Sequence, residues 1–93
     1  IVNDSRLELA FNLIENISKK KFFEQFKIKL INVTVPSSTY IVIDNTEIII
    51  GNNNIGQKLE ILERILEEKL NRDISLVKYI DLRYRRVYLG IKR

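Results

Sequence analysis

The chain of 93 residues contains no cysteine, histidine, tryptophan or methionine. Without Cys and His it lacks thiol nucleophiles, imidazole bases, disulfide bridges and the usual ligands of zinc. Aspartate and glutamate are the remaining acid–base candidates. On the predicted second helix, Glu60 lies one turn from Arg64 and Glu63 one turn from Glu67. The first has the pattern of a surface ion pair and the second that of a solvated like-charge pair, and neither indicates a catalytic dyad. We therefore expect no enzymatic activity, no metal and no cofactor.

Glycine and proline are also scarce, with three and one residues. Gly51 and Gly56 are separated by four residues between a predicted strand and a predicted helix, which is the arrangement of a phosphate-binding loop. However, Gln57 stands where the required lysine belongs, and Lys58 is not followed by Ser or Thr. The sequence therefore predicts a strand-end turn at Gly51, a first-turn position for Gly56 and no nucleotide site.

Long apolar runs are missing too, because none approaches the roughly 18 residues that a membrane-spanning helix requires. What is present is a composition 45% hydrophobic and 30% charged, typical of a folded chain. At this length it predicts a single domain over residues 1–93 with one modest core. The net charge of +4 could favour an acidic partner, anionic lipid or nucleic acid, but it is too small to choose among them.

Hydrophobic periodicity predicts two helices and five strands. The helices are expected over residues 5–20 and 54–70. The strands are expected over residues 26–35, 39–43, 47–50, 76–84 and 87–92. Strands joined by short turns pair antiparallel, and only the connection that carries the second helix is long enough for a crossover. The expected fold class is therefore α+β, with both helices on one face of a mainly antiparallel sheet of about five strands.

The buried faces of the two helices are predicted from residue spacing. On the first helix the expected apolar stripe consists of Leu7, Ala10, Phe11, Ile14 and Ile17. On the second it consists of Ile55, Leu59, Leu62, Leu66 and Leu70, widened by Ile61 and Ile65. Asn54 and Gln57 have the spacing of a capping box at the start of this second helix.

The most distinctive segment is Tyr79-Ile80-Asp81-Leu82-Arg83-Tyr84 near the C-terminus. Its alternation predicts a half-buried strand with Asp81 and Arg83 on the outward face, paired with each other or with neighbouring strands, or with Arg83 directed at a partner. This strand resembles the end of the extracytoplasmic domain of the bacterial cell-division protein family FtsQ/DivIB. The hairpin ending at Gly51 and the helix around Lys58 and Leu59 precede it in the same order as in that family.

The resemblance implies a non-enzymatic scaffold of the division complex (the divisome), which acts in septation by protein–protein interaction. In this family a segment of FtsB adds to the last strands of the domain, a form of β-augmentation that recruits the FtsB and FtsL pair. The resemblance also implies a location on the extracytoplasmic face of the inner (cytoplasmic) membrane, with an anchor and a membrane-proximal domain outside residues 1–93. By position, the implied partner-binding residues are Arg83, Tyr84, Val87, Tyr88, Leu89, Gly90 and Ile91.

The final strand also has physical features expected of a binding edge. Val87, Leu89 and Ile91 are predicted to face the core, while Tyr88 and Gly90 point outward, so that a bulky side chain at Gly90 would obstruct an incoming strand without touching the core. If no other strand of the sheet pairs with the outer side of this final strand, its backbone N–H and C=O groups are free to pair with a strand from another protein.

Two other classes of function have less support in the sequence. A small nucleic-acid-binding domain could use the basic C-terminal hairpin, but only Tyr79 and Tyr88 could stack on bases. A domain that acts catalytically on cell-wall material has no supporting set of residues. Arg85 and Arg86 are poor residues for a tight turn, which predicts a longer or irregular connection before the last strand.

Overall fold

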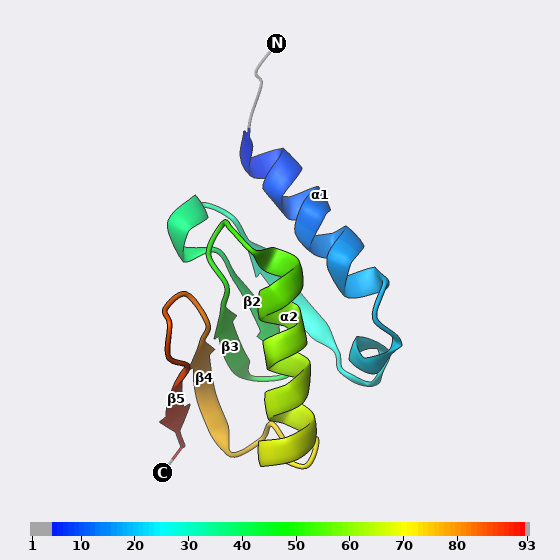
Figure 1. The fold of residues 1–93 in the computed structure, drawn as a ribbon, viewed down its shortest axis with the longest axis vertical. Helices are drawn as coiled ribbons and strands as arrows, with labels where there is room; N and C mark the ends of the chain where they lie inside the picture. Colours follow the sequence, from blue (N-terminus) through cyan, green and yellow to red (C-terminus); the bar gives the residue numbers. More distant parts are fainter. Residues whose placement is uncertain (1–4, 93) are drawn as a thin grey trace.

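The computed structural model describes residues 5–92, which form two α-helices and five strands (Figure 1). The helices are α1 (Ser5–Ser18) and α2 (Ile55–Arg64). The strands are β1 (Ile28–Asn32), β2 (Tyr40–Ile43), β3 (Thr46–Ile49), β4 (Val77–Asp81) and β5 (Tyr88–Ile91). Short 3-10 turns span Lys21–Gln25 and Pro36–Ser38, and α2 continues into a π-helical turn at Ile65–Lys69.

The five strands form one sheet in the order β1-β2-β3-β4-β5. All neighbouring pairs are antiparallel except β3 and β4, which are parallel and joined through α2. The sheet is therefore mixed and mostly antiparallel. The predicted α+β class and the crossover at the second helix are both confirmed.

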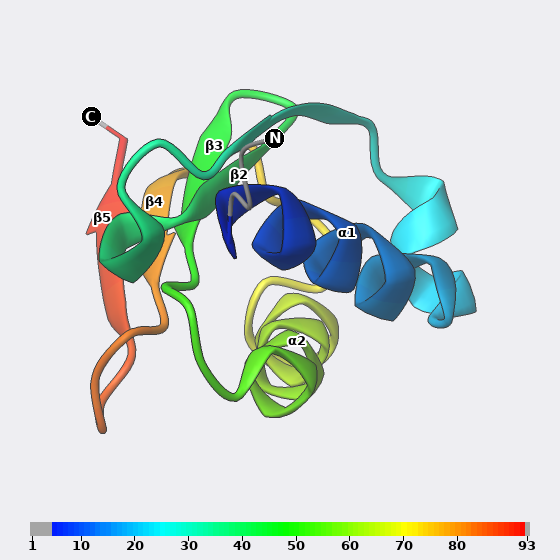
Figure 2. The same ribbon diagram turned by 90° about the horizontal axis from the view of Figure 1, so that it is seen from above.

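Both helices lie on one side of the sheet, as Figure 2 shows from above. The strands alternate accordingly: on β2, Ile41 and Ile43 are buried under the helices while Tyr40 and Val42 occupy the opposite, open face. The buried apolar side chains form one core, which consists of Leu13, Phe23, Ile41, Ile43, Ile48, Ile50, Ile55, Leu59, Leu62, Leu66, Ile74, Val77, Ile80 and Leu82.

Helix α2 packs as its apolar spacing predicts. Leu59, Leu62 and Leu66 are fully buried. The predicted capping box, however, is not formed, because Asn54 adopts a left-handed conformation (φ 50°) and its side chain makes no capping hydrogen bond. The first turn is closed instead by the backbone, with the Lys58 amide donating to the Asn54 carbonyl at 2.9 Å.

Helix α1 buries a face that only partly matches the predicted stripe. Of that stripe, Leu7, Phe11 and Ile14 are exposed, whereas Ile17 packs against the core as predicted. Leu13, which is completely buried, and Leu9, which packs against the core, were not in the predicted stripe. Apolar residues cover more than one side of this helix, and its contacts with α2 and the sheet select the side that contains Leu13.

Candidate functional site

Strand β5 lies at one edge of the sheet, and β4 is its only strand neighbour among residues 5–92. It is drawn in red at the outer limit of the sheet in Figure 1. The backbone groups on the outer side of β5 therefore have no strand partner in the described part of the chain. This edge is the candidate functional site.

The backbone direction of β5 follows from its pairing with β4. The Lys92 amide donates to the Leu76 carbonyl at 3.0 Å, so Lys92 bonds inward. Ile91, which faces Val77, then belongs to a non-hydrogen-bonded pair of the antiparallel ladder. Because the bonding direction alternates along a strand, Ile91 and Leu89 direct their N–H and C=O groups away from β4, toward the open edge.

The side chains of β5 differ in burial from the prediction. Leu89 is opposite Ile80, so it lies on the helix side of the sheet as expected. It is nevertheless 40% exposed, and Ile91 is 61% exposed. Only Val87, which precedes the strand, packs against the core. The predicted direction of these side chains is thus correct for Leu89, but Leu89 and Ile91 are not covered, because the outermost strand extends beyond the cover that α2 provides.

Gly90 lies on the open face, paired with Tyr79 of β4. A Cβ atom placed on Gly90 would clash with the Tyr79 ring, so the ring lies directly over the glycine. A bulky residue at Gly90 would therefore meet the Tyr79 ring, which lies outside the core, a contact that the sequence did not indicate. Tyr79 takes the space that a Gly90 side chain would need.

Arg83 is held within its own strand end rather than directed outward. Its guanidinium donates two hydrogen bonds to the Asp81 carboxylate, at 3.0 and 2.8 Å, and a third to the Ser38 hydroxyl at 3.1 Å. The Arg83 bonds hold the pKa of Asp81 below its ordinary value even though burial opposes this shift. The ion pair therefore joins two residues of one strand end and ties it to the Pro36–Ser38 turn.

Tyr84 and Tyr88 extend this arrangement onto the exposed surface. The Arg83 guanidinium carbon lies 5.0 Å from the centre of the Tyr84 ring, and the Tyr84 and Tyr88 rings meet edge to face at 6.1 Å. Both tyrosines are exposed. Arg83, Tyr84 and Tyr88, three of the residues expected to bind a partner, are thus brought together, with Arg83 against the Tyr84 ring.

Lys58 is a site residue that the sequence analysis missed. This lysine is almost buried, and its Nζ donates to the Ile50 carbonyl at 2.7 Å and to Asn53 Oδ1 at 2.8 Å. Burial lowers the pKa of Lys58, and the charge of Arg83 adds to this effect, while that of Asp81 opposes it. The sequence contained one indication that Lys58 is buried. Lys58 falls three residues after Ile55 and four before Leu62, which places it on the buried stripe of the helix.

A pocket of about 330 Å³ opens where these groups meet. It is lined by Ser37, Gly51, Asn52, Asn53, Lys58, Arg83 and Tyr84. Gly51 has a φ of 82°, which confirms the predicted turn at the strand end. The pocket thus has two cations in its wall and adjoins the exposed tyrosines.

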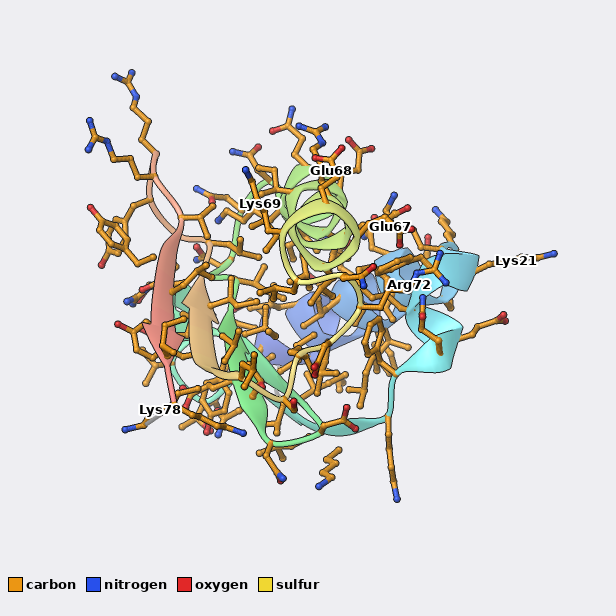
Figure 3. The ribbon with its side chains drawn as sticks, turned by 90° about the horizontal axis from the view of Figure 1, so that it is seen from below. Lys21, Glu67, Glu68, Lys69, Arg72 and Lys78 are labelled. Atoms are coloured by element: carbon orange, nitrogen blue, oxygen red, sulfur yellow. The ribbon has the colours of Figure 1, made fainter. Side chains whose placement is uncertain are left out.

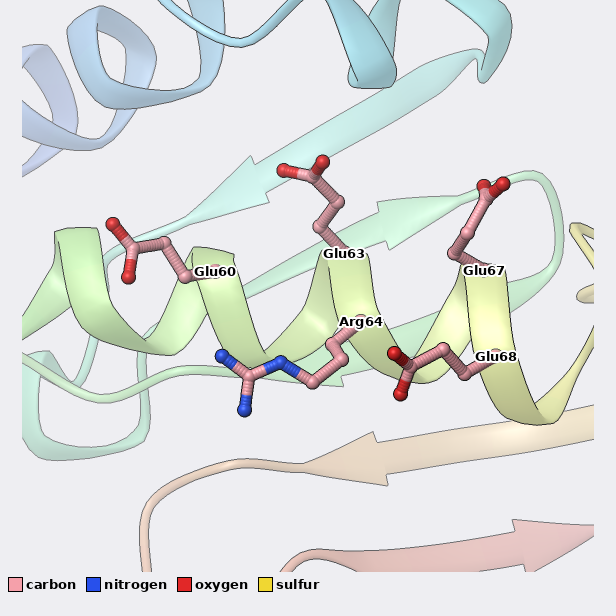
Figure 4. Close-up of a pocket in the computed structure, with 5 residues that line it drawn as sticks. All are labelled: Glu60, Glu63, Arg64, Glu67 and Glu68. Carbon is pink, nitrogen blue, oxygen red and sulfur yellow. The ribbon is translucent and has the colours of Figure 1, made fainter.

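The outer face of α2 bears acidic residues, as expected of a solvated surface. Figure 4 shows Glu63 and Glu67 on one flank of the helix and Arg64 and Glu68 on the flank nearer β4 and β5. Glu67 accepts two hydrogen bonds of 2.8 Å from Arg72, which keep its pKa below the ordinary value. A general acid requires a raised pKa, so Glu67 does not have the property of one.

Among residues 5–92, no group of three or more acidic residues is placed to hold a metal ion. No helix within this range is long and apolar enough to cross a membrane.

The fold and the edge define a class of protein: a small α+β module whose sheet ends in an uncovered strand next to an arginine- and tyrosine-bearing turn. A family model described as cell division protein FtsQ/DivIB, C-terminal, matches residues 3–83. The chain therefore belongs to the FtsQ/DivIB family of cell-division proteins. A search of curated proteins gives no significant match. The family match ends at Arg83, so the assignment of a role to β5 depends on the geometry of the edge.

Proposed function

We propose that this domain is a non-enzymatic scaffold of the bacterial division complex that binds an FtsB/FtsL-type partner by strand addition to β5. The observation that carries the proposal is the outward direction of the Leu89 and Ile91 backbone groups at an uncovered edge. A strand that adds there gains main-chain hydrogen bonds with no rearrangement of the sheet. The domain would act on the extracytoplasmic side of the cytoplasmic membrane, held by an anchor outside these residues.

A comparison of the two sheet edges favours β5 over β1. The β1 ladder is irregular between Ile28 and Leu30, where Lys29 lies, and Lys27 directly precedes this segment. Bulges and lysines are the features by which proteins protect an edge from pairing with other chains. On the β5 edge, the irregularity of the ladder lies in β4, between Val77 and Tyr79, so Tyr88–Ile91 itself runs without interruption.

The decisive experiment replaces Ile91 by proline. Its N–H faces away from β4, so Ile91→Pro removes an outward donor and leaves the β4–β5 ladder intact. We expect affinity for the soluble FtsB–FtsL pair of the same organism, measured by calorimetric titration, to fall at least tenfold. The matched control is Ile91→Ala, which keeps the N–H. Its affinity should stay within about threefold of the parent because this side chain is mostly exposed.

Both variants should keep the melting temperature and circular dichroism spectrum of the parent. If folded Ile91→Pro binds the pair as tightly as the parent does, strand addition to β5 is wrong. The nucleic-acid alternative makes a different prediction for the same protein, namely binding to single-stranded RNA that weakens steeply with salt through Arg85 and Arg86. Such binding, with no affinity for the division proteins, would replace the scaffold function.

A further inference from the structure

An apolar groove of about 320 Å³ lies between α2 and β5. Its apolar walls are Ile61 and Ile65 from the helix side and Val87 and Leu89 from the strand side. Arg64, Glu68 and Lys69 complete the lining. Figure 3 shows Lys69 on the side of α2 that faces β5, whereas Glu67 and Arg72 lie on the opposite side toward Lys21. Ile61 and Leu89 leave apolar surface open to solvent here.

The pairing geometry of β5 determines which residues of an added strand lie beside this groove. Leu89 directs its backbone groups outward and its side chain toward the helix side. A residue directly opposite Leu89 in an added antiparallel strand exchanges both backbone hydrogen bonds with it. Side chains of directly opposite residues lie on the same face of a sheet, with Cβ atoms about 5 Å apart. That residue therefore places its side chain next to Leu89, at the mouth of the groove.

We propose that the partner strand carries a leucine- or phenylalanine-sized side chain opposite Leu89, and that this side chain fills the groove between α2 and β5. The proposal rests on the proposed function, because it requires a strand paired with β5. It adds a chemical requirement for the partner: apolar residues at alternate positions, with the one opposite Leu89 the largest. The walls of the groove select an apolar occupant, because a polar side chain buried against Ile61 and Ile65 would lose its hydrogen bonds to water.

The same geometry gives different requirements on the other face of the added strand. Its alternate side chains would lie next to Tyr88 and Gly90, on the open side of the sheet. Tyr79 already covers Gly90 there, so the surface offers no space comparable to the groove. Selectivity for an apolar residue should therefore be confined to the helix-side positions.

The test truncates each wall of the groove and compares the affinity for the soluble FtsB–FtsL pair. Leu89→Ala removes the strand wall and Ile61→Ala the helix wall. We expect each to weaken binding about tenfold, since truncating a central apolar contact of an interface has effects of this size. Leu30→Ala is the matched control, because Leu30 is a similarly exposed leucine on the opposite edge strand. It should change the affinity less than twofold.

A scan of the partner tests the same contact from the other side. Alanine at successive positions of the FtsB segment should weaken binding at every second residue, with one position dominant. In the Leu89→Ala background that position should lose most of its effect. Binding that depends on Leu89 and Ile61 but shows no two-residue period in the partner would place a helix in the groove, and the proposal would be wrong.

The two proposals can fail separately. If Ile91→Pro abolishes binding while Leu89→Ala and Ile61→Ala bind as the parent does, strand addition holds and the groove has no role in recognition. If Ile91→Pro binds normally, the proposed function itself fails.

The mass of the free domain at the titration concentration is measured as well. A β5-mediated dimer that competes with the partner would assign the groove to a second copy of this chain, contrary to the proposal.

Discussion

Replacement of Leu62 by alanine tests the assignment of the core directly. Leu62 lies in the middle of α2, has 0% exposure and belongs to the core cluster beneath both helices. Removing the side chain of a fully buried leucine costs its transfer free energy and leaves a cavity, in total about 2 to 5 kcal/mol. For a domain of this size each kcal/mol lowers the melting temperature by roughly 4 to 8 °C. We therefore expect Leu62→Ala to melt at least about 8 °C below the parent.

The informative control is Phe11→Ala on α1. Sequence periodicity places Phe11 in the buried stripe, whereas the structure leaves it 62% exposed. Its truncation should change the free energy of unfolding by no more than about 0.5 kcal/mol. Urea unfolding of the two variants, with equal m-values, gives the comparison. A loss for Phe11→Ala as large as that for Leu62→Ala would refute the packing of α1 described above.

Two further substitutions test the environment of the edge. The carboxylate of Asp81 has a depressed pKa, so it stabilises the fold above its ordinary pKa near pH 4, and this stabilisation is lost as the pH falls below that value. The melting temperatures of the parent and Asp81→Asn should therefore differ most near pH 7 and converge below about pH 4. A difference independent of pH would contradict the ion pair. Gly90→Ala should destabilise the domain because of the Tyr79 ring, but much less in a Tyr79→Ala background. Equal losses in both backgrounds would show that the ring does not cover the glycine.

The order of elements could be predicted from the sequence because each signal was local. The turn at Gly51, the stripe of α2 and the alternation of Ile80 and Leu82 each specify a short segment, and chain connectivity then restricts the pairing of the strands. The buried face of α1 could not be predicted in this way. The Leu7, Phe11 and Ile14 set and the Leu9, Leu13 and Ile17 set both have helical spacing, and only contacts with distant elements distinguish them.

In the candidate site, too, local sequence patterns predict some features, whereas others depend on contacts between residues that are distant in the sequence. The alternation of residues 87–92 predicted a last strand, and its pairing with β4 places it at an edge of the sheet formed by residues 5–92. The role of Lys58 did not follow, because the carbonyl it bonds belongs to Ile50, and the helix spacing of Lys58 gives no indication of that partner. The groove beside Leu89 likewise combines residues from α2 and β5 that are more than twenty positions apart, and local periodicity does not bring them together.

The conformation of β5 is maintained by features outside the strand, and this is the strongest argument that the edge has a function. A short edge strand that contains a glycine is intrinsically weak. Here the Tyr79 ring covers Gly90, and the Asp81–Arg83–Ser38 hydrogen bonds fix the end of β4 from which the connection to β5 begins. Neither feature covers the outer backbone groups of Leu89 or Ile91. An edge that is both ordered and open needs little further ordering when a strand adds to it, so less of the binding free energy is lost to conformational entropy.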